Sequence, residues 1–159
     1  MIPAPPQAIR LCKRWEGFHH VKPGQLGIAY PYLCPAGFWT IGYGHLCPKD
    51  HPPIDLAKGE EYLAADLTTA VLGVVKYCPN ILNNPTGRFA ALVDFTFNLG
   101  VGRLQMSTLR RRVNEGNWSE VAYELRRWVY GGGKKLPGLV LRREDEIRVM
   151  QETVAEEQK

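Results

Sequence analysis

The sequence predicts an α+β protein that is predominantly helical and carries one small antiparallel sheet near its N-terminus. Residues 28–45 alternate aromatic and β-branched side chains between glycines and prolines, which is typical of short strands joined by tight turns. Apolar residues recur at helical spacing through most of the chain after residue 55. The length of 159 residues suits a single domain that buries a core without disulfides or metals.

A first helix is expected over residues 7–16. Its apolar positions are Ala8, Leu11, Cys12 and Trp15. They repeat at the spacing of one helix face, and Gly17 offers a C-terminal stop. Glu16 therefore falls in the last turn, where the helix dipole disfavours a carboxylate. Glu16 is either placed there for chemistry or is a solvated surface glutamate.

The predicted sheet lies between two loops, residues 19–27 and 46–53. The first loop carries the adjacent pair His19 and His20. The pair is either solvated or a weak metal site, because neighbouring side chains rarely converge on one ion.

Further helices are expected in the rest of the chain, each with its own start signal. They run from an Asp55 cap to about Tyr77, from Pro85 to Leu99, over 108–115 after a Ser107 cap, over 118–128 after Asn117 or Ser119, and from Pro137 to about Val154. The helix that starts at Pro85 is almost entirely apolar, so we expect it to be the central buried helix. Gly100 and Gly102 are predicted to end it. The connecting segments are a turn at 80–84, a flexible basic loop at 131–137 and a charged tail at 156–159.

The net charge of +4 and the pI of about 8.9 favour a polyanionic partner such as a cell-wall polymer, a membrane surface or nucleic acid, or they serve solubility alone. No apolar run approaches the roughly 18 residues of a membrane span. Residues 1–6 lack the pattern of a signal peptide, so we expect a cytosolic protein with reduced cysteines. The cysteine spacing matches no zinc pattern, although Cys34, Cys47 and His51 could be assembled into a site.

The segments Trp15-Glu16-Gly17-Phe18 and Thr40-Ile41-Gly42-Tyr43-Gly44-His45 resemble the catalytic region of phage-type lysozymes, glycoside hydrolase family 24. The family motif is a glutamate, then an aspartate or cysteine, then a threonine, with five residues between the last two, as between Cys34 and Thr40 here. The C-terminal half resembles the family in the same order, through residues 89–100, 107–109, 114–116, 128, 131–132 and 138–143. Several motifs in sequence are far more specific than one alone.

Two features depart from the family pattern. Seventeen residues separate Glu16 from Cys34, about nine more than is usual for the family. The extra residues fall within 19–31. The second motif position is also the cysteine form, so its role stays open.

The resemblance implies a lysozyme-like fold, with a sheet lobe at about 15–55, a helical lobe at about 56–156 together with the N-terminal helix, and an active-site cleft between them. It also implies hydrolysis of the β-1,4 bond between N-acetylmuramic acid and N-acetylglucosamine in peptidoglycan, leading to lysis of the host cell. Glu16 would be the general acid, with Cys34 and Thr40 on the other side of the sugar. Cys34 would orient water, act as a thiolate base, attack carbon itself, or only pack in the interior.

Four further residues are expected to bind substrate: Tyr43, His45, Asn98 and Arg142. His45 alternatively packs and hydrogen-bonds the hairpin, and Asn98 and Arg142 alternatively orient Glu16. We expect no cofactor, no metal, no nucleic-acid partner, no stable membrane insertion and a monomer that leaves the host cytoplasm through a holin-type lesion. The alternatives are a lytic transglycosylase, which would yield an anhydro sugar, and a non-catalytic helical module that binds glycan or nucleic acid.

Overall fold

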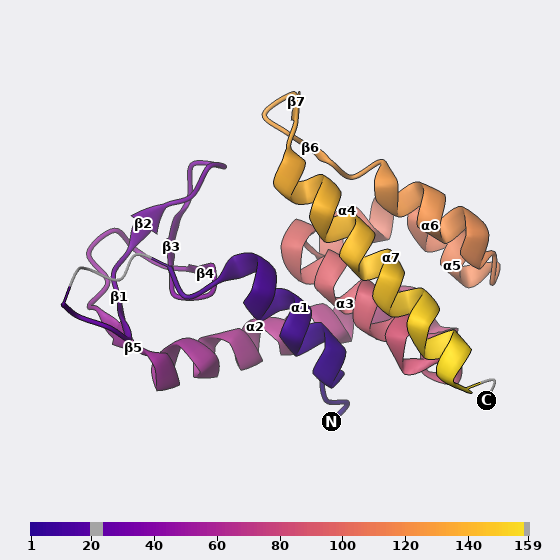
Figure 1. Cartoon of the computed structure of the whole chain (residues 1–159), viewed down its shortest axis with the longest axis horizontal. Coiled ribbons are helices and arrows are strands. Elements are labelled where there is room, and N and C mark those ends of the chain that lie inside the picture. Colours follow the sequence, from indigo (N-terminus) through magenta and orange to yellow (C-terminus); the bar gives the residue numbers. More distant parts are fainter. Residues whose placement is uncertain (20–23, 158–159) are drawn as a thin grey trace. The chain divides into compact units, whose positions relative to one another are not determined.

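The computed structural model describes residues 1–19 and 24–157, and Figure 1 shows helices through most of the chain. The helices are α1 (Pro6–Glu16), α2 (Leu56–Tyr77), the 3-10 helix η1 (Pro79–Asn83), α3 (Thr86–Leu99), α4 (Val101–Met106), α5 (Thr108–Asn114), α6 (Trp118–Arg126) and α7 (Pro137–Glu157). The strands are β1 (Ile28–Ala29), β2 (Tyr32–Leu33), β3 (Trp39–Ile41), β4 (His45–Leu46), β5 (Ile54–Asp55), β6 (Tyr130–Gly131) and β7 (Lys134–Lys135). The predicted class, α+β and predominantly helical, is confirmed.

The chain forms two compact units, which divide inside α1 and α2. The first unit holds Met1–Leu11 and Leu67–Lys159, and the second holds Cys12–Asp66. The second unit contains β1 to β5, and the first contains α3 to α7.

The centre of the second unit is the three-stranded antiparallel sheet β2-β3-β4. Its register places Tyr32 opposite Thr40 and Ile41 opposite His45. Gly42 and Gly44 in the turn between β3 and β4 have φ angles of +61° and +79°, which is a backbone conformation that favours glycine. The glycine-aromatic pattern of this stretch therefore encodes the turn as well as the strands.

The sheet predicted as one continuous stretch is divided in two, and this corrects the sequence prediction. β1 pairs with β5, so that Ile28 lies opposite Asp55 and Ala29 opposite Ile54. The pairing is between segments far apart in the sequence, which local pattern does not report. The Asp55 carboxylate still acts as the predicted cap of α2, because its Oδ1 accepts a hydrogen bond from the Lys58 backbone N–H at 2.8 Å.

A small core joins these two sheets. Ala29, Ile41 and Ile54 are buried together, and Phe18 packs against them. A Cβ atom built on Gly59 of α2 would lie 2.5 Å from Phe18 Cε2. Only a glycine lets α2 approach the Phe18 ring so closely, and this contact fixes the segment after Glu16 against α2.

The core of the first unit is α3, which packs along α7 (Figure 1). Its buried residues are Gly87, Phe89, Ala90, Ala91, Leu92, Val93, Asp94, Phe95 and Thr96. A helix that is apolar nearly all round belongs in the interior, and each large side chain buried there contributes about 1.5–3 kcal/mol. The prediction of a central buried helix is confirmed.

The predicted caps of the next two helices are also confirmed. Ser107 Oγ accepts from the Arg110 backbone N–H at 3.0 Å, and Asn117 Oδ1 accepts from the Glu120 backbone N–H at 3.4 Å. Each cap satisfies a backbone donor that has no partner inside its own helix.

Four segments of the first unit differ from the sequence prediction. Gly102 does not end a helix but lies inside α4, and residues 79–83 form the 3-10 helix η1 where a turn was expected. The basic segment after residue 130 is a hairpin, β6 paired with β7, where a flexible loop was predicted. Gly132 and Gly133 have positive φ angles, which is how so short a hairpin reverses the chain. Trp128 lies beyond the end of α6.

Candidate active site

Three side chains share one face of the β2-β3 hairpin. Tyr32 lies directly opposite Thr40, and directly opposed residues point to the same face of a sheet. The Cys34 backbone N–H donates to the Phe38 carbonyl at 2.8 Å, so the ladder continues and alternation returns the Cys34 side chain to that face. Tyr32 thus joins the predicted pair Cys34 and Thr40. Tyr32 was not among the residues predicted from the sequence, although its position two residues before Cys34 in a strand is a signal that predicts a shared face.

Glu16, the last residue of α1, reaches the turn that follows β3. A Cβ atom built on Gly44 would lie 2.9 Å from Glu16 Oε2, so the carboxylate rests against the Gly44 backbone. Gly44 also has the positive φ angle of +79°. Glycine is therefore required at this position for two independent reasons, and one of them is the space that the Glu16 carboxylate occupies.

The pKa of the Tyr32 phenol responds to the other three groups. Partial burial is the largest cause that raises the pKa of Tyr32, the Thr40 hydroxyl lowers this pKa, and the charges of Glu16 and Cys34 raise it further. Such influences act mainly between near neighbours. An acid, a thiol and two hydroxyl groups therefore lie in one neighbourhood of the second unit.

The Thr40 hydroxyl is buried and has unused hydrogen-bonding capacity. Thr40 is 5% exposed, and its Oγ1 makes no hydrogen bond of standard length and angle to any residue within 1–19 and 24–157. A buried hydroxyl in this condition costs about 1–3 kcal/mol, which is a cost that functional sites commonly carry.

Tyr43 and His45, two of the predicted substrate contacts, belong to the same unit. Tyr43 is 8% exposed, and its ring lies 5.5 Å from the ring of Phe18. His45 Nδ1 lies 2.9 Å from Asp66 Oδ2, and the His45 ring stacks on Tyr62 at 4.1 Å between centroids. Both residues therefore fasten the sheet, His45 by holding β4 against α2.

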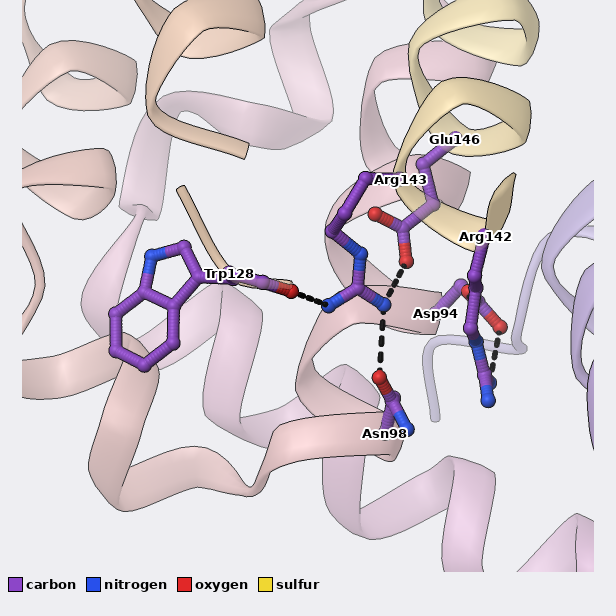
Figure 2. Close-up of polar contacts among 6 residues, drawn as sticks. All are labelled: Asp94, Asn98, Trp128, Arg142, Arg143 and Glu146. Carbon is purple, nitrogen blue, oxygen red and sulfur yellow. Dashed lines mark hydrogen bonds and ion pairs between the residues drawn. The ribbon is translucent and has the colours of Figure 1, made fainter. Parts of the chain in front are cut away.

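Asn98 and Arg142, the other two predicted contacts, belong to the first unit, and Figure 2 shows them with their neighbours. Arg142 is 4% exposed, and its guanidinium group donates twice to Asp94, from Nε at 2.9 Å and from Nη2 at 2.8 Å. This two-bond geometry is the strongest form of an ion pair between arginine and a carboxylate. Arg142 has little surface left for a ligand.

Arg143 connects Asn98 to a second buried ion pair, which was not predicted from the sequence. Its Nη2 donates to Asn98 Oδ1 at 2.8 Å and to Glu146 Oε1 at 2.7 Å, and its Nη1 donates to the Trp128 carbonyl at 3.5 Å (Figure 2). The side chains of Arg143 and Glu146 are fully buried. Burial is the main cause that raises the pKa of Glu146 well above its ordinary value and lowers that of Arg143.

Across residues 1–19 and 24–157, histidine, cysteine, aspartate and glutamate side chains do not gather in groups of three or more that could hold a metal ion. His20, one of the two histidines considered as metal ligands, lies outside the described residues. His51 Nε2 lies 3.0 Å from the Tyr62 hydroxyl and its Nδ1 lies 2.7 Å from the Pro52 carbonyl. No helix in the described part of the chain has the length and apolar character to cross a membrane.

A small sheet that carries a thiol and a hydroxyl, a glutamate beside its turn and a separate helical core together define a lysozyme-like α+β fold. The sequence model of the phage lysozyme family matches residues 13–146, and the chain belongs to that family. It is 37% identical over 140 residues to the endolysin of Bacillus phage B103, which covers 87% of this chain and 50% of that protein. It is 33% identical over 135 residues to the SAR-endolysin of Enterobacteria phage PA-2, which covers 79% of this chain and 77% of that protein.

A solved structure is similar over nearly the whole chain. The muramidase domain of SpmX from Asticaccaulis excentricus superposes with a TM-score of 0.73 at 28% identity, covering 91% of this chain and 95% of that domain. The chain spans about half the length of the Bacillus phage B103 endolysin.

Proposed function

We propose that this chain is an endolysin muramidase that hydrolyses the β-1,4 bond between N-acetylmuramic acid and N-acetylglucosamine in peptidoglycan. Family membership supports this assignment, and so do the names of the similar proteins, which are endolysins and a muramidase domain. The observation that carries the proposal is the position of the Glu16 carboxylate against Gly44, in the same neighbourhood as Cys34 and Thr40. Glycoside hydrolysis requires such a proton donor together with a group that supplies or directs the nucleophile.

In the proposed reaction, protonated Glu16 donates its proton to the glycosidic oxygen as the bond to the anomeric carbon breaks. A water molecule held by Thr40 and Cys34 attacks that carbon from the opposite face and releases one proton to the surrounding water, from which Glu16 regains its own. The product has a new reducing end with inverted configuration. If Cys34 attacked carbon itself, a covalent glycosyl thioether would form first, and its hydrolysis would give retained configuration. We favour the water route because the anomeric carbon is hindered and a buried hydroxyl at Thr40 is suited to hold water.

Among the predicted sugar contacts, we propose direct contact for His45 and Asn98, which are partly exposed. Tyr43 and Arg142 are buried, so we propose that Tyr43 supports the sheet of the second unit through packing and that Arg142 supports the first unit through its ion pair with Asp94.

The test is Glu16→Gln, which keeps the size of the side chain and removes the acid. We expect loss of at least about 100-fold in the clearing of permeabilised Gram-negative cells, the usual contribution of a positioned acid. Glu115→Gln, a change in an exposed glutamate paired with Arg112, is the matched control and should be fully active. A folded Glu16→Gln protein with more than about a tenth of the normal rate would refute the assignment.

Two further measurements separate the remaining alternatives. Mass spectrometry of the digest distinguishes the expected reducing ends from the anhydro sugars of a lytic transglycosylase. Expression in host cells with and without a holin tests the proposed route from cytoplasm to cell wall, since lysis without holin would contradict it.

A further inference from the structure

We propose that Tyr32 is a positioning residue of the reaction, whose hydroxyl fixes the orientation of the Thr40 hydroxyl and, through it, of the attacking water. This inference rests on the proposed function and adds a residue to the machinery that the lysozyme motif names.

Strand pairing fixes the relation between Tyr32 and Thr40. The two residues are directly opposed in the register of β2 and β3, so their Cβ atoms lie about 4.5–5.5 Å apart on one face of the sheet. β3 is held on its other edge by β4, which makes it the central strand. The pair is thus built on paired backbone and not on a loop.

The ring of Tyr32 is held by the segment that follows Glu16. The His19 ring packs edge-on to the Tyr32 ring, with 6.0 Å between centroids and 71° between planes. The same His19 ring lies over Gly17, where a Cβ atom would come 2.9 Å from Nε2. His19 therefore ties the Tyr32 ring to the end of α1, the element that carries the acid.

The chemistry of the two hydroxyls explains what this placement achieves. A threonine hydroxyl has one donor and two acceptor positions, and Thr40 Oγ1 is buried without a standard hydrogen bond among the described residues. Burial raises the pKa of Tyr32 more than the Thr40 hydroxyl lowers it, so the phenol keeps its proton at neutral pH and can donate. Donation to one lone pair of Thr40 Oγ1 leaves the second to accept from water. Catalytic hydrogen bonds are often long before substrate binds and tighten in the complex.

The first test is Tyr32→Phe, which removes the hydroxyl and keeps the ring. We expect kcat to fall about fivefold, the usual effect of one neutral hydrogen bond, while KM and Tm stay unchanged. Tyr30→Phe is the matched control, since the Tyr30 hydroxyl donates to Gln25 Oε1 at 2.6 Å on the exposed surface and should leave kcat unchanged. A normal kcat for Tyr32→Phe overturns the proposal. So does a fall in Tm or a rise in KM that accounts for the lost rate.

The second test is a double-mutant cycle with Thr40→Val, which removes the Thr40 hydroxyl at nearly constant shape. If Tyr32 acts through Thr40, Tyr32→Phe has almost no further effect on kcat in the Thr40→Val protein. An equal loss in both backgrounds overturns the proposal. Thr40→Ser gives an independent check, because a serine hydroxyl without the γ-methyl rotates more freely. In the Thr40→Ser protein, the fall in kcat caused by Tyr32→Phe should therefore be larger than in the parent protein. An equal fall in kcat in the two proteins contradicts a positioning role for Tyr32.

These outcomes are distinct from failure of the proposed function. An active Glu16→Gln protein removes the muramidase assignment itself. An inactive Glu16→Gln protein together with a fully active Tyr32→Phe protein leaves the assignment in place and removes only the role of Tyr32.

Discussion

The contact between Glu16 and Gly44 makes a substitution of this glycine the most informative single change in the protein. In Gly44→Ala the new Cβ atom would lie 2.9 Å from Glu16 Oε2, whereas ordinary contact begins at about 3.4 Å. The carboxylate must therefore shift by about 0.5 Å, or the turn must move. A displacement of 1 Å at a reacting group costs about 100-fold in rate, so half that displacement predicts about a tenfold fall in kcat.

The same substitution has a separate effect on stability. Gly44 has φ +79°, and a left-handed backbone costs an alanine about 1–2 kcal/mol. For a chain of this size, 1 kcal/mol lowers Tm by about 2–4 °C, so Gly44→Ala should melt about 2–8 °C lower. Rates are measured on soluble peptidoglycan fragments well below this melting point, which separates the two effects.

The matched control is Gly116→Ala. Gly116 has φ +71°, and a Cβ atom built on it meets no described atom within 4 Å. It should show a similar fall in Tm with a normal kcat. Equal kcat values for Gly44→Ala and the parent protein would refute the inference that this glycine makes room for the acid.

Four further predictions concern the thiol, the buried ion pairs, the pH dependence of stability and the net charge. Cys34→Asp should keep or raise activity and Cys34→Ser should lose only part of it, because attack by water needs only a hydrogen-bond acceptor at this position, whereas covalent attack needs a thiolate. An inactive Cys34→Ser protein, together with a product of retained anomeric configuration in NMR spectra, would establish the covalent route. Asp94→Asn should destabilise the protein by about 3–5 kcal/mol, because it leaves the Arg142 charge buried without its partner. The control Glu144→Gln breaks an exposed ion pair and should cost under about 1 kcal/mol. Equal melting points for these two variants would contradict the prediction. Burial raises the pKa of Glu146 in the folded state, so the folded protein binds this proton more tightly than the unfolded chain. Stability relative to Glu146→Gln should therefore be greatest at acid pH and should fall as the pH rises above 4.5, the ordinary pKa of a glutamate. Denaturant unfolding across pH measures this, and a rise in stability with pH would contradict it. The clearing rate should fall with added salt if the net charge of +4 attracts the anionic wall, and a flat salt profile would assign the charge to solubility.

Local sequence determined most of the helices, the caps of α2, α5 and α6, and the motif. Gly17 ends α1 with a positive φ angle, and Ser107 caps α5 by bonding a backbone N–H three residues away. Signals of this kind act between near neighbours in the chain, so they can be read without the fold. The motif spacing from Cys34 to Thr40 belongs to the same class, because it spans one hairpin. The order of residues therefore sufficed to predict the family and the candidate acid.

Only the tertiary structure decided which distant residues meet. Three contacts join segments that are separated in sequence. They are the pairing of β1 with β5, the contact of the Glu16 carboxylate with the Gly44 backbone and the ion pair of Arg142 with Asp94. The charge of Arg142 gave no warning that the side chain would be buried, because burial depends on whether a carboxylate from another helix arrives to compensate it. Tyr32 likewise gained its place beside Thr40 from a strand register. Packing sets such contacts, and packing is a property of the whole chain, which no short stretch of residues encodes alone.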